Sequence, residues 1–305
     1  MTIQQLRYAV AVANVNSINE AAKKLYISQP SLSSAIKELE DEINIAIFAR
    51  NNKGVTVTSE GEEFLGYARQ ILSQVELMEE KYLEGTNIKK KFGVSTQHYS
   101  FAVKAFVEMV KSFDMNEYEF AIRETRTHDV LSDVKNGKSE IGILYLNDFN
   151  EKILSKLLKE YGLEFCELTQ CKGYVYLWKG HPLADKSIIT MEELQEYPCL
   201  SFEQGENNSF YFAEEILSTY DYKRTIKACD RATILNLMIG LNGYTLCSGI
   251  ICEELNGDDY KAVLLDNEEI MRIGYIKREH LNLSHIGERY IEELKSYLNL
   301  EENRE

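Results

Sequence analysis

The sequence predicts an α plus α/β fold, in which a winged helix-turn-helix and a long dimerisation helix precede an α/β region of two subdomains. Three observations support this prediction. Short helical patterns with capping residues fill residues 1–47, apolar residues recur at heptad spacing over residues 59–84, and strands alternate with helices from residue 92 onward. The chain has 305 residues, which is room for two or three domains at about 150 residues each.

Charge is unevenly distributed along the chain. The formal net charge is −15, from 34 basic and 49 acidic side chains. Residues 1–58 carry a net charge of +1, whereas residues 92–305 carry −14. An acidic surface repels polyanions, so the sequence excludes a protein that coats nucleic acid or anionic membrane with its whole surface. Only the N-terminal part has a charge that permits contact with nucleic acid.

The sequence predicts a cytoplasmic protein without a membrane segment. No stretch approaches the roughly 18 uninterrupted apolar residues of a membrane helix, and residues 8–15 fit a first amphipathic helix better than a signal peptide. Six cysteines form no C-x-x-C pair and have no nearby histidine, which predicts reduced thiols and no disulfide, metal or cofactor. They are Cys166, Cys171, Cys199, Cys229, Cys247 and Cys252.

Three short helices are predicted within residues 1–47. Apolar residues share one face of the first helix, and residues 14–16 interrupt that pattern. Ser17 and Glu20 have the spacing of a capping box, in which each side chain satisfies the other's backbone donor. This pair therefore predicts the start of the second helix.

The third helix begins at Ser28, a favoured N-cap residue, with Pro30 in its first turn, where proline is tolerated. Leu32, Ile36 and Leu39 have the spacing of a buried stripe. Two helices joined by a tight turn, with a polar outer face, form a helix-turn-helix arrangement.

A hairpin that resembles a wing follows the third helix. Ile47 and Phe48 are predicted to close the core, and residues 50–54 have the composition of a turn. Residues 55–57 alternate in character as a short return strand does.

A long helix is predicted from Thr58 or Ser59 to about Glu84. Its apolar residues follow one another at intervals of three and four, which is a heptad pattern. A helix of about 25 residues spans about 38 Å, and we expect its stripe to bury against a second copy of the chain; the alternative is a helix packed on its own domain. The predicted dimerisation residues are Phe64, Ala68, Ile71, Val75, Met78 and Tyr82. Gly85 is expected to end the helix, before a basic linker at residues 86–91.

From residue 92 onward, alternating strands and helices predict parallel sheets covered by helices. Two similar runs of this kind indicate two subdomains with a cleft between them. The predicted extended segments are 93–95, 118–124, 141–146, 163–168, 173–178, 199–202, 225–229, 244–247, 261–265 and 270–277. The predicted helices are 99–110, 128–135, 151–158, 210–220, 233–241 and 286–298.

The three short helices and the hairpin share a residue pattern with a known family. Its members here are Asn-Ser-Ile-Asn-Glu-Ala-Ala (16–22), Leu25, Ser-Gln-Pro-Ser-Leu-Ser (28–33), Ile36, Leu39-Glu40, Ile47-Phe48, Arg50, Val57-Thr58 and Gly61. Together they closely resemble the LysR-type transcriptional regulators, without a gap over roughly the first 80 residues. The resemblance implies a periplasmic-binding-protein-like effector domain with an inducer site between its subdomains. It also implies assembly into a dimer of dimers, which is a homotetramer.

Three positions depart from the family pattern. Asn16 stands where the family usually has Gly, Ile43-Asn44 stands for Leu-Gly, and Ile47 stands for Leu. Asparagine tolerates left-handed backbone conformations, so both turns remain feasible.

The resemblance and the element boundaries together predict three regions. Residues 1–58 are expected to form the winged helix-turn-helix DNA-binding domain, and residues 59–91 the linker helix and hinge. Residues 92–305 are expected to form the effector-binding domain, with subdomain I at about 92–162 and 271–305 and subdomain II at about 169–265.

The third helix is the predicted DNA-reading element, because a recognition helix enters the major groove by its N-terminal end. Gln29 is expected to pair with adenine, and Pro30 to contact a thymine methyl group. The alternative for Ser28 is a simple helix cap, and for Gln29 a solvated first-turn residue. The expected DNA-binding residues are Ser28, Gln29, Pro30, Ser31, Ser33, Ser34 and Lys37, with Arg50 and Lys53 contacting phosphate or minor groove from the wing.

Effector-binding residues are expected where strands end and helices begin, because free backbone N–H groups there bind anions. These segments offer hydroxyl and amide donors that suit a small carboxylate, such as an amino acid or a metabolic acid. The alternative for each residue is a helix cap. The expected effector residues are Ser95, Thr96, Gln97, His98, Thr125, Thr127, Gln204, Asn208 and Thr233.

The leading hypothesis is a DNA-binding transcription regulator that responds to a small-molecule effector. Its predicted partners are a double-stranded promoter palindrome, the effector and a second copy of the chain, with RNA polymerase as a further candidate. One alternative is a solute-binding or metabolic enzyme domain with an accessory DNA-binding module; another is a nucleoid-type architectural protein. The sequence has no P-loop, G-x-G-x-x-G, H-E-x-x-H or G-x-S-x-G motif, which disfavours an enzyme.

Overall fold

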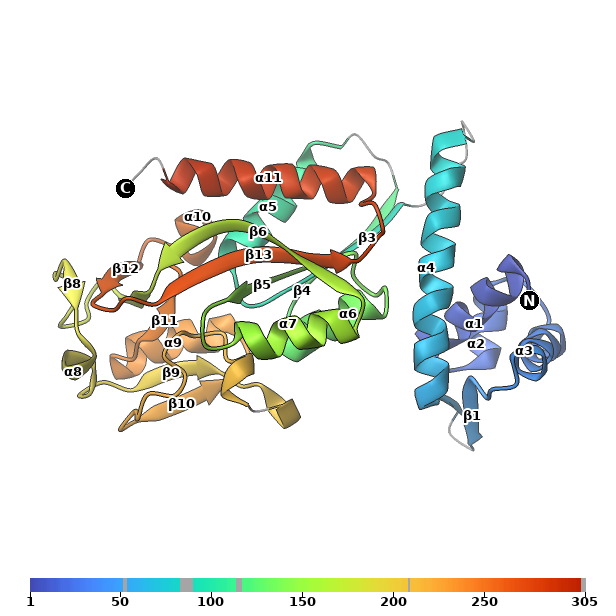
Figure 1. The fold of residues 1–305 in the computed structure, drawn as a ribbon, viewed down its shortest axis with the longest axis horizontal. Helices are drawn as coiled ribbons and strands as arrows, with labels where there is room; N and C mark the ends of the chain where they lie inside the picture. Colours follow the sequence, from blue (N-terminus) through green and yellow to red (C-terminus); the bar gives the residue numbers. More distant parts are fainter. Residues whose placement is uncertain (52–53, 83–89, 114–116, 208, 303–305) are drawn as a thin grey trace. The chain divides into compact units, whose positions relative to one another are not determined.

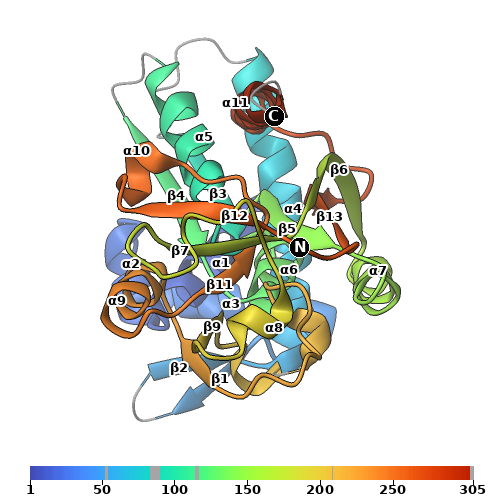
Figure 2. The same cartoon turned by 90° about the vertical axis from the view of Figure 1, so that its left-hand side faces the viewer.

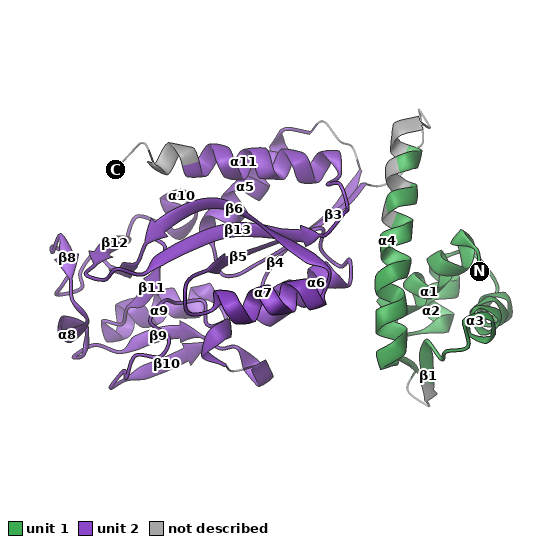
Figure 3. Ribbon diagram, in the orientation of Figure 1, with its two compact units in different colours: residues 1–88 green, residues 89–305 purple. Residues whose placement is uncertain are grey.

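The structure is a computed structural model that describes residues 1–51, 54–82, 90–113, 117–207 and 209–302. The chain divides into two compact units, Met1–Ile88 and Lys89–Glu305 (Figure 3). Among the described residues, no helix has both the length and the apolar character needed to cross a membrane.

The first unit contains the three predicted short helices, the hairpin and the long helix. Its elements are α1 (Ile3–Val15), α2 (Ile18–Lys24), α3 (Gln29–Ile43), β1 (Phe48–Asn51), β2 (Gly54–Val57) and α4 (Ser59–Tyr82). The predicted stripe on α3 is confirmed, since Leu32, Ile36 and Leu39 are fully buried. They pack against Ala21 and Ala22 of α2, whose small side chains let the two helices approach closely.

The predicted capping residues act as caps, with one correction. The Ser28 hydroxyl accepts a hydrogen bond from Ser31 N, and the Ser17 hydroxyl accepts one from Glu20 N. The reciprocal half of the box at Ser17 was predicted wrongly, because the Glu20 carboxylate pairs with Lys23 at 2.8 Å. A complete capping box occurs instead at Thr2, at the start of α1.

Asparagine ends two helices in the left-handed conformation. Asn16 has φ 52° after α1, and Asn44 has φ 55° after α3. Asparagine in place of the family's usual glycine is therefore compatible with the turn at both positions. The Asn16 carbonyl also accepts a hydrogen bond from Val55 N, which ties the hairpin to α1.

The hairpin is antiparallel, with Phe48 opposite Val57. The Glu40 carboxylate accepts hydrogen bonds from both Ile47 N and Phe48 N, so α3 fixes the start of β1. The Thr58 hydroxyl accepts a hydrogen bond from Gly61 N and thereby caps α4.

The second unit has two lobes, each built on its own sheet (Figure 1, Figure 2). The first lobe has a five-stranded sheet in the order β4-β3-β5-β13-β6. Its elements are β3 (Lys90–Thr96), α5 (Ser100–Lys111), β4 (Tyr118–Glu124), α6 (Thr127–Lys135), β5 (Ile141–Leu146), α7 (Glu151–Glu160), β6 (Leu163–Lys172), β13 (Ile270–Arg278) and α11 (His285–Glu302).

Helices cover both faces of the five-stranded sheet, because its central strand is apolar on both faces. In β5, Ile143 and Tyr145 pack in the cluster that includes residues of α5 and α11. Leu144 and Leu146 face the other way and pack with residues of α6 and α7. The same two pairs of helices lie on opposite sides of the sheet in Figure 1.

The second lobe has a four-stranded sheet in the order β11-β7-β12-β8 and a parallel pair, β9 and β10. Its elements are β7 (Tyr174–Trp178), β8 (Ile188–Ile189), α8 (Met191–Leu194), β9 (Cys199–Phe202), the 3₁₀ turns η1 (Gly205–Asn207) and η2 (Phe210–Phe212), β10 (Thr225–Ala228), α9 (Arg231–Leu241), β11 (Thr245–Cys247), α10 (Glu253–Asn256) and β12 (Tyr260–Leu265).

The prediction of purely parallel sheets is wrong. β3 is parallel to β4 and β5, but β13 runs antiparallel to both β5 and β6. The chain leaves the first lobe along β6 and returns along β13, and two neighbouring passes in opposite directions must pair antiparallel. β7 is likewise antiparallel to β11 and β12.

The predicted helix at residues 210–220 is also wrong. Only Phe210–Phe212 forms a short 3₁₀ turn, and Leu217 has φ 53°, which a continuous helix does not allow. The Tyr145 hydroxyl donates to the carbonyls of Ala213 and Glu215. Side chains from the first lobe thus bind the carbonyl groups that a helix would have used internally.

Candidate functional site

The exposed face of α3 is the first candidate site. Gln29, Pro30, Ser31, Ser34 and Lys37 are exposed, whereas the stripe of the same helix is buried. Ser28 is exposed as well, whereas Ser33 is half-buried. This face offers hydroxyl, amide and ammonium groups to a partner without disturbing the core.

Three serines on this face have partners within the chain. The Ser28 and Ser31 hydroxyl oxygens lie 2.7 Å apart, and Ser28 also caps the helix. The Ser34 hydroxyl donates to the Glu38 carboxylate at 3.1 Å. Ser28 can therefore cap the helix and still present its hydroxyl group on the exposed face.

The predicted wing contacts fall largely outside the described residues. The backbone of Arg50 lies in β1 opposite Val55, and nothing is described of its side chain. Lys53 lies outside the described residues altogether.

Tyr26 was missed by the sequence analysis. It lies in the turn between α2 and α3 with φ 55°, and its side chain is 95% exposed. Hydrogen bonds from Tyr26 N to the Lys23 carbonyl and from Ile27 N to the Ala22 carbonyl hold this turn in place. A bulky aromatic residue with positive φ is uncommon, and this outlier lies two residues before the cap of α3.

The predicted dimerisation stripe of α4 divides between two faces. Leu65, Ala68 and Leu72 are buried, and Ala68 and Leu72 cluster with Leu6 of α1; Phe64 packs at the edge of that cluster. The prediction that Ala68 faces a partner is therefore wrong, because the unit's own first helix covers it, whereas Phe64 is half-buried and stays a predicted dimerisation residue.

Other residues of the predicted stripe remain available on α4. Ile71 and Met78 are 40% and 57% exposed, and Val75 is half-buried. Tyr67, which was not predicted, is 59% exposed and lies one turn before Ile71. The Tyr82 side chain lies outside the described residues.

Several predicted effector residues bind one another inside the first lobe. The Ser95 hydroxyl donates to Asp133 at 2.6 Å and lies 2.8 Å from the Ser139 hydroxyl, under α6. The Gln97 amide donates to the Thr127 hydroxyl and accepts from the Tyr99 hydroxyl. These polar atoms already have partners in the interior of the lobe, and none of the predicted residues Ser95, Gln97 and Thr127 lines the cavity described below.

The remaining predicted residues are also spread apart. Thr125 donates to Asp129, and the Thr233 hydroxyl donates to Asp230 in the cap of α9. The Thr96 hydroxyl is buried without a partner among the described residues, and it does not line the cavity described below. Gln204 accepts from Thr127 N and donates to Glu214, so it links the two lobes. Asn208 lies outside the described residues.

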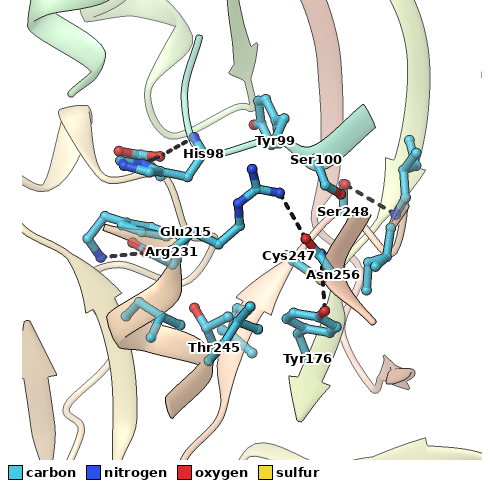
Figure 4. A pocket seen from close by; sticks show the side chains of 17 residues that line it. His98, Tyr99, Ser100, Tyr176, Glu215, Arg231, Thr245, Cys247, Ser248 and Asn256 are labelled. Atoms are coloured by element: carbon cyan, nitrogen blue, oxygen red, sulfur yellow. Dashed lines mark hydrogen bonds and ion pairs between the residues drawn. The ribbon is translucent and has the colours of Figure 1, made fainter. Parts of the chain in front are cut away.

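A cavity of about 70 Å³ lies within the second unit, where the loop between β3 and α5 meets the second lobe (Figure 4). Of the predicted effector residues that the structure describes, only His98 lines it. Most of the lining is apolar or aromatic. The lining residues are His98, Tyr99, Ser100, Tyr176, Phe202, Glu214, Glu215, Arg231, Ile234, Leu235, Thr245, Leu246, Cys247, Ser248, Ile250, Ile251 and Asn256.

Arg231 extends from the start of α9 toward Asn256 in the close view (Figure 4). Its guanidinium donates to the Asn256 side-chain oxygen at 2.9 Å and forms an ion pair with Glu124 of the first lobe. The Asn256 amide donates in turn to the Tyr176 hydroxyl at 3.2 Å. This chain of contacts holds a cation at the edge of the cavity.

His98 faces a carboxylate across the lobe boundary. Its Nδ1 lies 2.8 Å from Glu214, which also accepts from His98 N, and its ring stacks on Phe202 at 3.8 Å. Burial acts to lower the pKa of His98, but the hydrogen bond and charge of Glu214 outweigh it, and the pKa is raised overall. The contact is an ion pair when His98 is protonated.

Two polar groups of the lining stand out by their surroundings. Burial and the neighbouring Glu214 raise the pKa of Glu215 to about 8, so this carboxyl group holds a proton at neutral pH. The Thr245 hydroxyl is buried and has no hydrogen-bond partner among the described residues. A buried unpaired hydroxyl is costly, and in proteins such a group commonly binds a ligand or a water molecule.

The chemistry of the lining suits binding. Burial raises the pKa of the Cys247 thiol to about 12, which keeps it protonated and unreactive at neutral pH. Within the described part of the chain, no cluster of three His, Cys, Asp or Glu side chains has the arrangement of a metal site. Polar groups of both lobes instead border a cavity that is lined mainly by apolar and aromatic side chains.

Two family models match the chain. The model described as bacterial regulatory helix-turn-helix protein, lysR family, matches residues 3–62, and the LysR substrate binding domain matches residues 97–299. Three similar proteins are transcriptional regulators of the helix-turn-helix type. YnfL of Escherichia coli is 28% identical over 68% of each chain, and AlsR of Bacillus subtilis is 28% identical over 66% of this chain and 64% of its own. YvbU of Bacillus subtilis is 24% identical over 87% of this chain and 91% of its own.

Solved structures share the fold over nearly the whole length. A full-length OxyR variant from Pseudomonas aeruginosa has a TM-score of 0.71 at 20% identity, covering 97% of this chain and 98% of its own. CbnR, described as a LysR family transcriptional regulator, has a TM-score of 0.57 at 16% identity, covering 97% and 99%. CbnR has also been solved with its target DNA, and that structure has a TM-score of 0.56.

Proposed function

The chain belongs to the LysR family of transcription regulators, with a helix-turn-helix DNA-binding part and an effector-binding domain, and on that premise we propose which surfaces perform each task. The exposed polar face of α3, a helix whose apolar stripe is fully buried, carries the proposal for DNA. A helix with short polar side chains at its N-terminal end can enter the major groove and reach base edges.

In the proposed DNA complex, Gln29 reads a base edge and Pro30 contacts a thymine methyl group. Ser28, Ser31, Ser33, Ser34 and Lys37 contact phosphate or base edges nearby, and Arg50 and Lys53 approach from the wing. We add Tyr26 to this surface, because its exposed phenol lies beside the start of α3 and tyrosine hydroxyls donate to phosphate oxygens.

The effector-binding site in this proposal is the cavity between the lobes of the second unit, and the effector is a small carboxylate or an amino-acid-like metabolite. The cavity offers a cationic side chain, Arg231, and an unpaired hydroxyl on Thr245. Both lobes contribute to its lining, so a ligand there can favour one lobe arrangement through its differential affinity. Movement would be taken up at the crossing strands β6 and β13.

The proposed assembly is a homodimer through the exposed residues of α4 and a tetramer formed from two dimers. Ile71 and Met78, together with Tyr67, form an exposed apolar row that a second α4 would cover. The proposed domains are residues 1–58 for DNA binding, 59–91 for dimerisation and hinge, and 92–305 for the effector. We also propose contact with RNA polymerase and action in the cytoplasm, where promoter DNA is found.

We propose no enzymatic activity for the chain. The alternative, a solute-binding or metabolic enzyme domain with an accessory DNA-binding module, would need a reactive group at the cavity. The inert Cys247 thiol and the ion-paired His98 do not provide a nucleophile with its base.

Selection of binding sites from random duplex DNA with the purified full chain tests the function. We expect enrichment of a partly palindromic sequence with half-sites about one helical turn apart. Failure to enrich any sequence, with the protein folded and assembled, would reject sequence-specific regulation. Pro30→Ala and Gln29→Ala proteins serve as a pair, since we expect both to fold but to select altered half-sites.

A further inference from the structure

The cavity wall contains two adjacent buried carboxyl groups, Glu214 and Glu215, in the segment after η2. Glu214 is well compensated. It accepts hydrogen bonds from His98 N at 2.9 Å and from the Gln204 amide at 2.9 Å, and it faces His98 Nδ1. The protonated His98 ring and the two N–H donors therefore compensate the negative charge of Glu214.

Glu215 is not balanced in the same way. Its carboxylate interacts with the backbone N–H groups of Phe202, at 2.8 Å, and of Glu214 and Glu215, but none of the ion pairs among the described residues includes it. Its exposed fraction is 7%, so solvent does little to stabilise a charge there. The titratable groups that interact with it are Glu214, the phenols of Tyr99, Tyr145 and Tyr222, and the Cys199 thiol.

The charges at the cavity do not sum to zero without a proton. His98 and Arg231 supply two positive charges, but Glu124, Glu214 and Glu215 supply three carboxyl groups, and Arg231 is already paired with Glu124. A buried net charge is expensive, so burial keeps a proton on Glu215. A ligand with only a carboxylate would add a further negative charge to this site, whereas a cationic ligand would supply the missing positive one.

The rest of the lining also suits a cation with an apolar body. The aromatic rings of Tyr99, Tyr176 and Phe202 border the cavity, and ring faces attract ammonium groups. The Thr245 hydroxyl has a free acceptor position for an N–H donor, and Figure 4 shows Thr245 on the wall of the same cavity. Ile234 and Ile250 provide apolar surface for the remainder of a small ligand.

We propose that the effector carries an ammonium group that pairs with the Glu215 carboxylate, so that the cavity recognises a small amine or an amino-acid-like molecule rather than a bare carboxylate. On binding, the ligand's ammonium group replaces the proton on Glu215. The Glu215 O–H bond breaks, its proton leaves to solvent, and the ligand's ammonium takes that place with all its N–H bonds intact. This inference rests on the proposed function of the cavity and narrows its ligand class.

Matched probes test the ammonium requirement on the full-length protein. L-valine, isobutylamine and 3-methylbutanoate share one branched apolar body, and L-phenylalanine, 2-phenylethylamine and 3-phenylpropanoate share another. We expect ammonium-bearing members to raise the melting temperature and to bind by calorimetry, and the two bare carboxylates not to bind. Equal or tighter binding of the carboxylates would overturn the proposal, and so would a lack of binding by all four ammonium compounds.

Proton release tests whether Glu215 is the carboxyl group that pairs with the ammonium. Amine binding at pH 7, measured in buffers of different ionisation enthalpy, should release about one proton per ligand. Glu215→Gln should abolish this release and weaken amine binding at least tenfold. The matched control is Glu206→Gln, the same change at an exposed position of the same lobe, which should leave both unchanged. Full proton release in a folded Glu215→Gln protein would reject the assignment.

A measurement on the unchanged protein covers the case in which Glu215→Gln fails to fold. For isobutylamine, affinity should rise with pH between 6 and 8, as the proton that competes for Glu215 is lost, and then stay level until the alkylamine itself deprotonates, at about the pKa of 10.4 of a lysine ammonium. A flat or falling profile over that range would contradict the proposal.

The DNA readout distinguishes this inference from the proposed function. If a carboxylate binds and changes operator affinity, the effector cavity stands and the ammonium requirement fails. If amines bind with proton release but operator affinity never changes, the ligand class stands and the regulatory role of the cavity fails.

Discussion

The two candidate sites differ in how the chain builds them. The face of α3 comes from one continuous segment, residues 28–37, whose caps and helical spacing are visible in the sequence. The cavity brings together His98, Glu214, Arg231 and Thr245, which come from four separate parts of the chain. A local pattern can therefore identify the first site, whereas the second exists only after the strands have paired.

The largest expected effect tests whether the α3 face acts alone or needs a second copy. Ile71→Glu together with Val75→Glu places charges on the exposed side of α4, where a partner would bury them unpaired. We expect light scattering to show loss of the dimer, and operator affinity to fall by about 1,000-fold because two half-sites are no longer read together.

Ile71→Leu together with Val75→Ile is the control for that double change, since it alters the same two positions without placing charge on them. It should leave assembly intact. A double variant that still forms dimers would show that α4 is not the interface and that the apolar row is covered in some other way.

The next largest effect concerns the cavity and the pH dependence of stability. The raised pKa of Glu215, about 8, means that the folded state holds a proton that the unfolded state has already released above its ordinary pKa. Stability should therefore fall as pH rises from 5 to 8, by a few kcal/mol at roughly 1.4 kcal/mol per pKa unit. His98 contributes a slope of the same sign, because its pKa is also raised, but only above its ordinary pKa of about 6.5.

Urea unfolding at several pH values, followed by the fluorescence of Trp178, measures this effect in the second unit alone. The chain has one tryptophan, and Trp178 lies in β7. The difference in stability between the unchanged protein and Glu215→Gln isolates Glu215, and it should favour the variant increasingly as pH rises. Parallel stability curves for the two proteins would show that Glu215 does not hold the proton.

The sequence was informative where neighbouring residues decide the structure. The cap at Ser28 and the stripe of Leu32 and Ile36 depend on spacings of three and four residues, and the structure confirms them. The predicted helix at 210–220 failed because distant groups decide its conformation. Tyr145 binds carbonyl oxygens of that segment, and no local pattern in the segment reports the presence of Tyr145.

The positions of the effector side chains could not be predicted from the sequence for the same reason, because groups distant in the chain decide them. Polar residues after a strand were expected to face a cleft, but Ser95 and Gln97 bind partners in their own lobe. One sequence feature could have indicated the cavity: the pair Glu214-Glu215, two adjacent acidic residues in an otherwise apolar and aromatic stretch. Arg231 lies at the start of α9, and its ion pair with Glu124 of the first lobe required the fold.

A smaller effect tests the reading role of α3. Gln29→Ala should relax sequence preference more than it lowers general affinity, because a side-chain amide at a base edge discriminates by about 1–3 kcal/mol. Competition between the selected operator and a duplex with one changed half-site measures the preference. If discrimination is unchanged, Gln29 is a solvated first-turn residue and the base contact belongs elsewhere on the helix.

The smallest effect concerns Tyr26, the one member of the proposed DNA surface that the sequence analysis did not find. Tyr26→Phe removes a hydroxyl group and keeps the ring and the positive φ, so the turn should be retained. The bond that is lost joins a neutral hydroxyl group to a charged, solvent-exposed phosphate, and a loss of about 1.5 kcal/mol corresponds to a roughly tenfold weaker operator affinity. A neutral donor releases no counterion, so the slope of affinity against salt should stay the same.

Lys37→Ala, in contrast, should flatten that slope by about one unit, because a lysine ammonium does displace a counterion from phosphate. Measuring both variants at several salt concentrations separates the two kinds of contact, and unchanged affinity in Tyr26→Phe would remove Tyr26 from the surface.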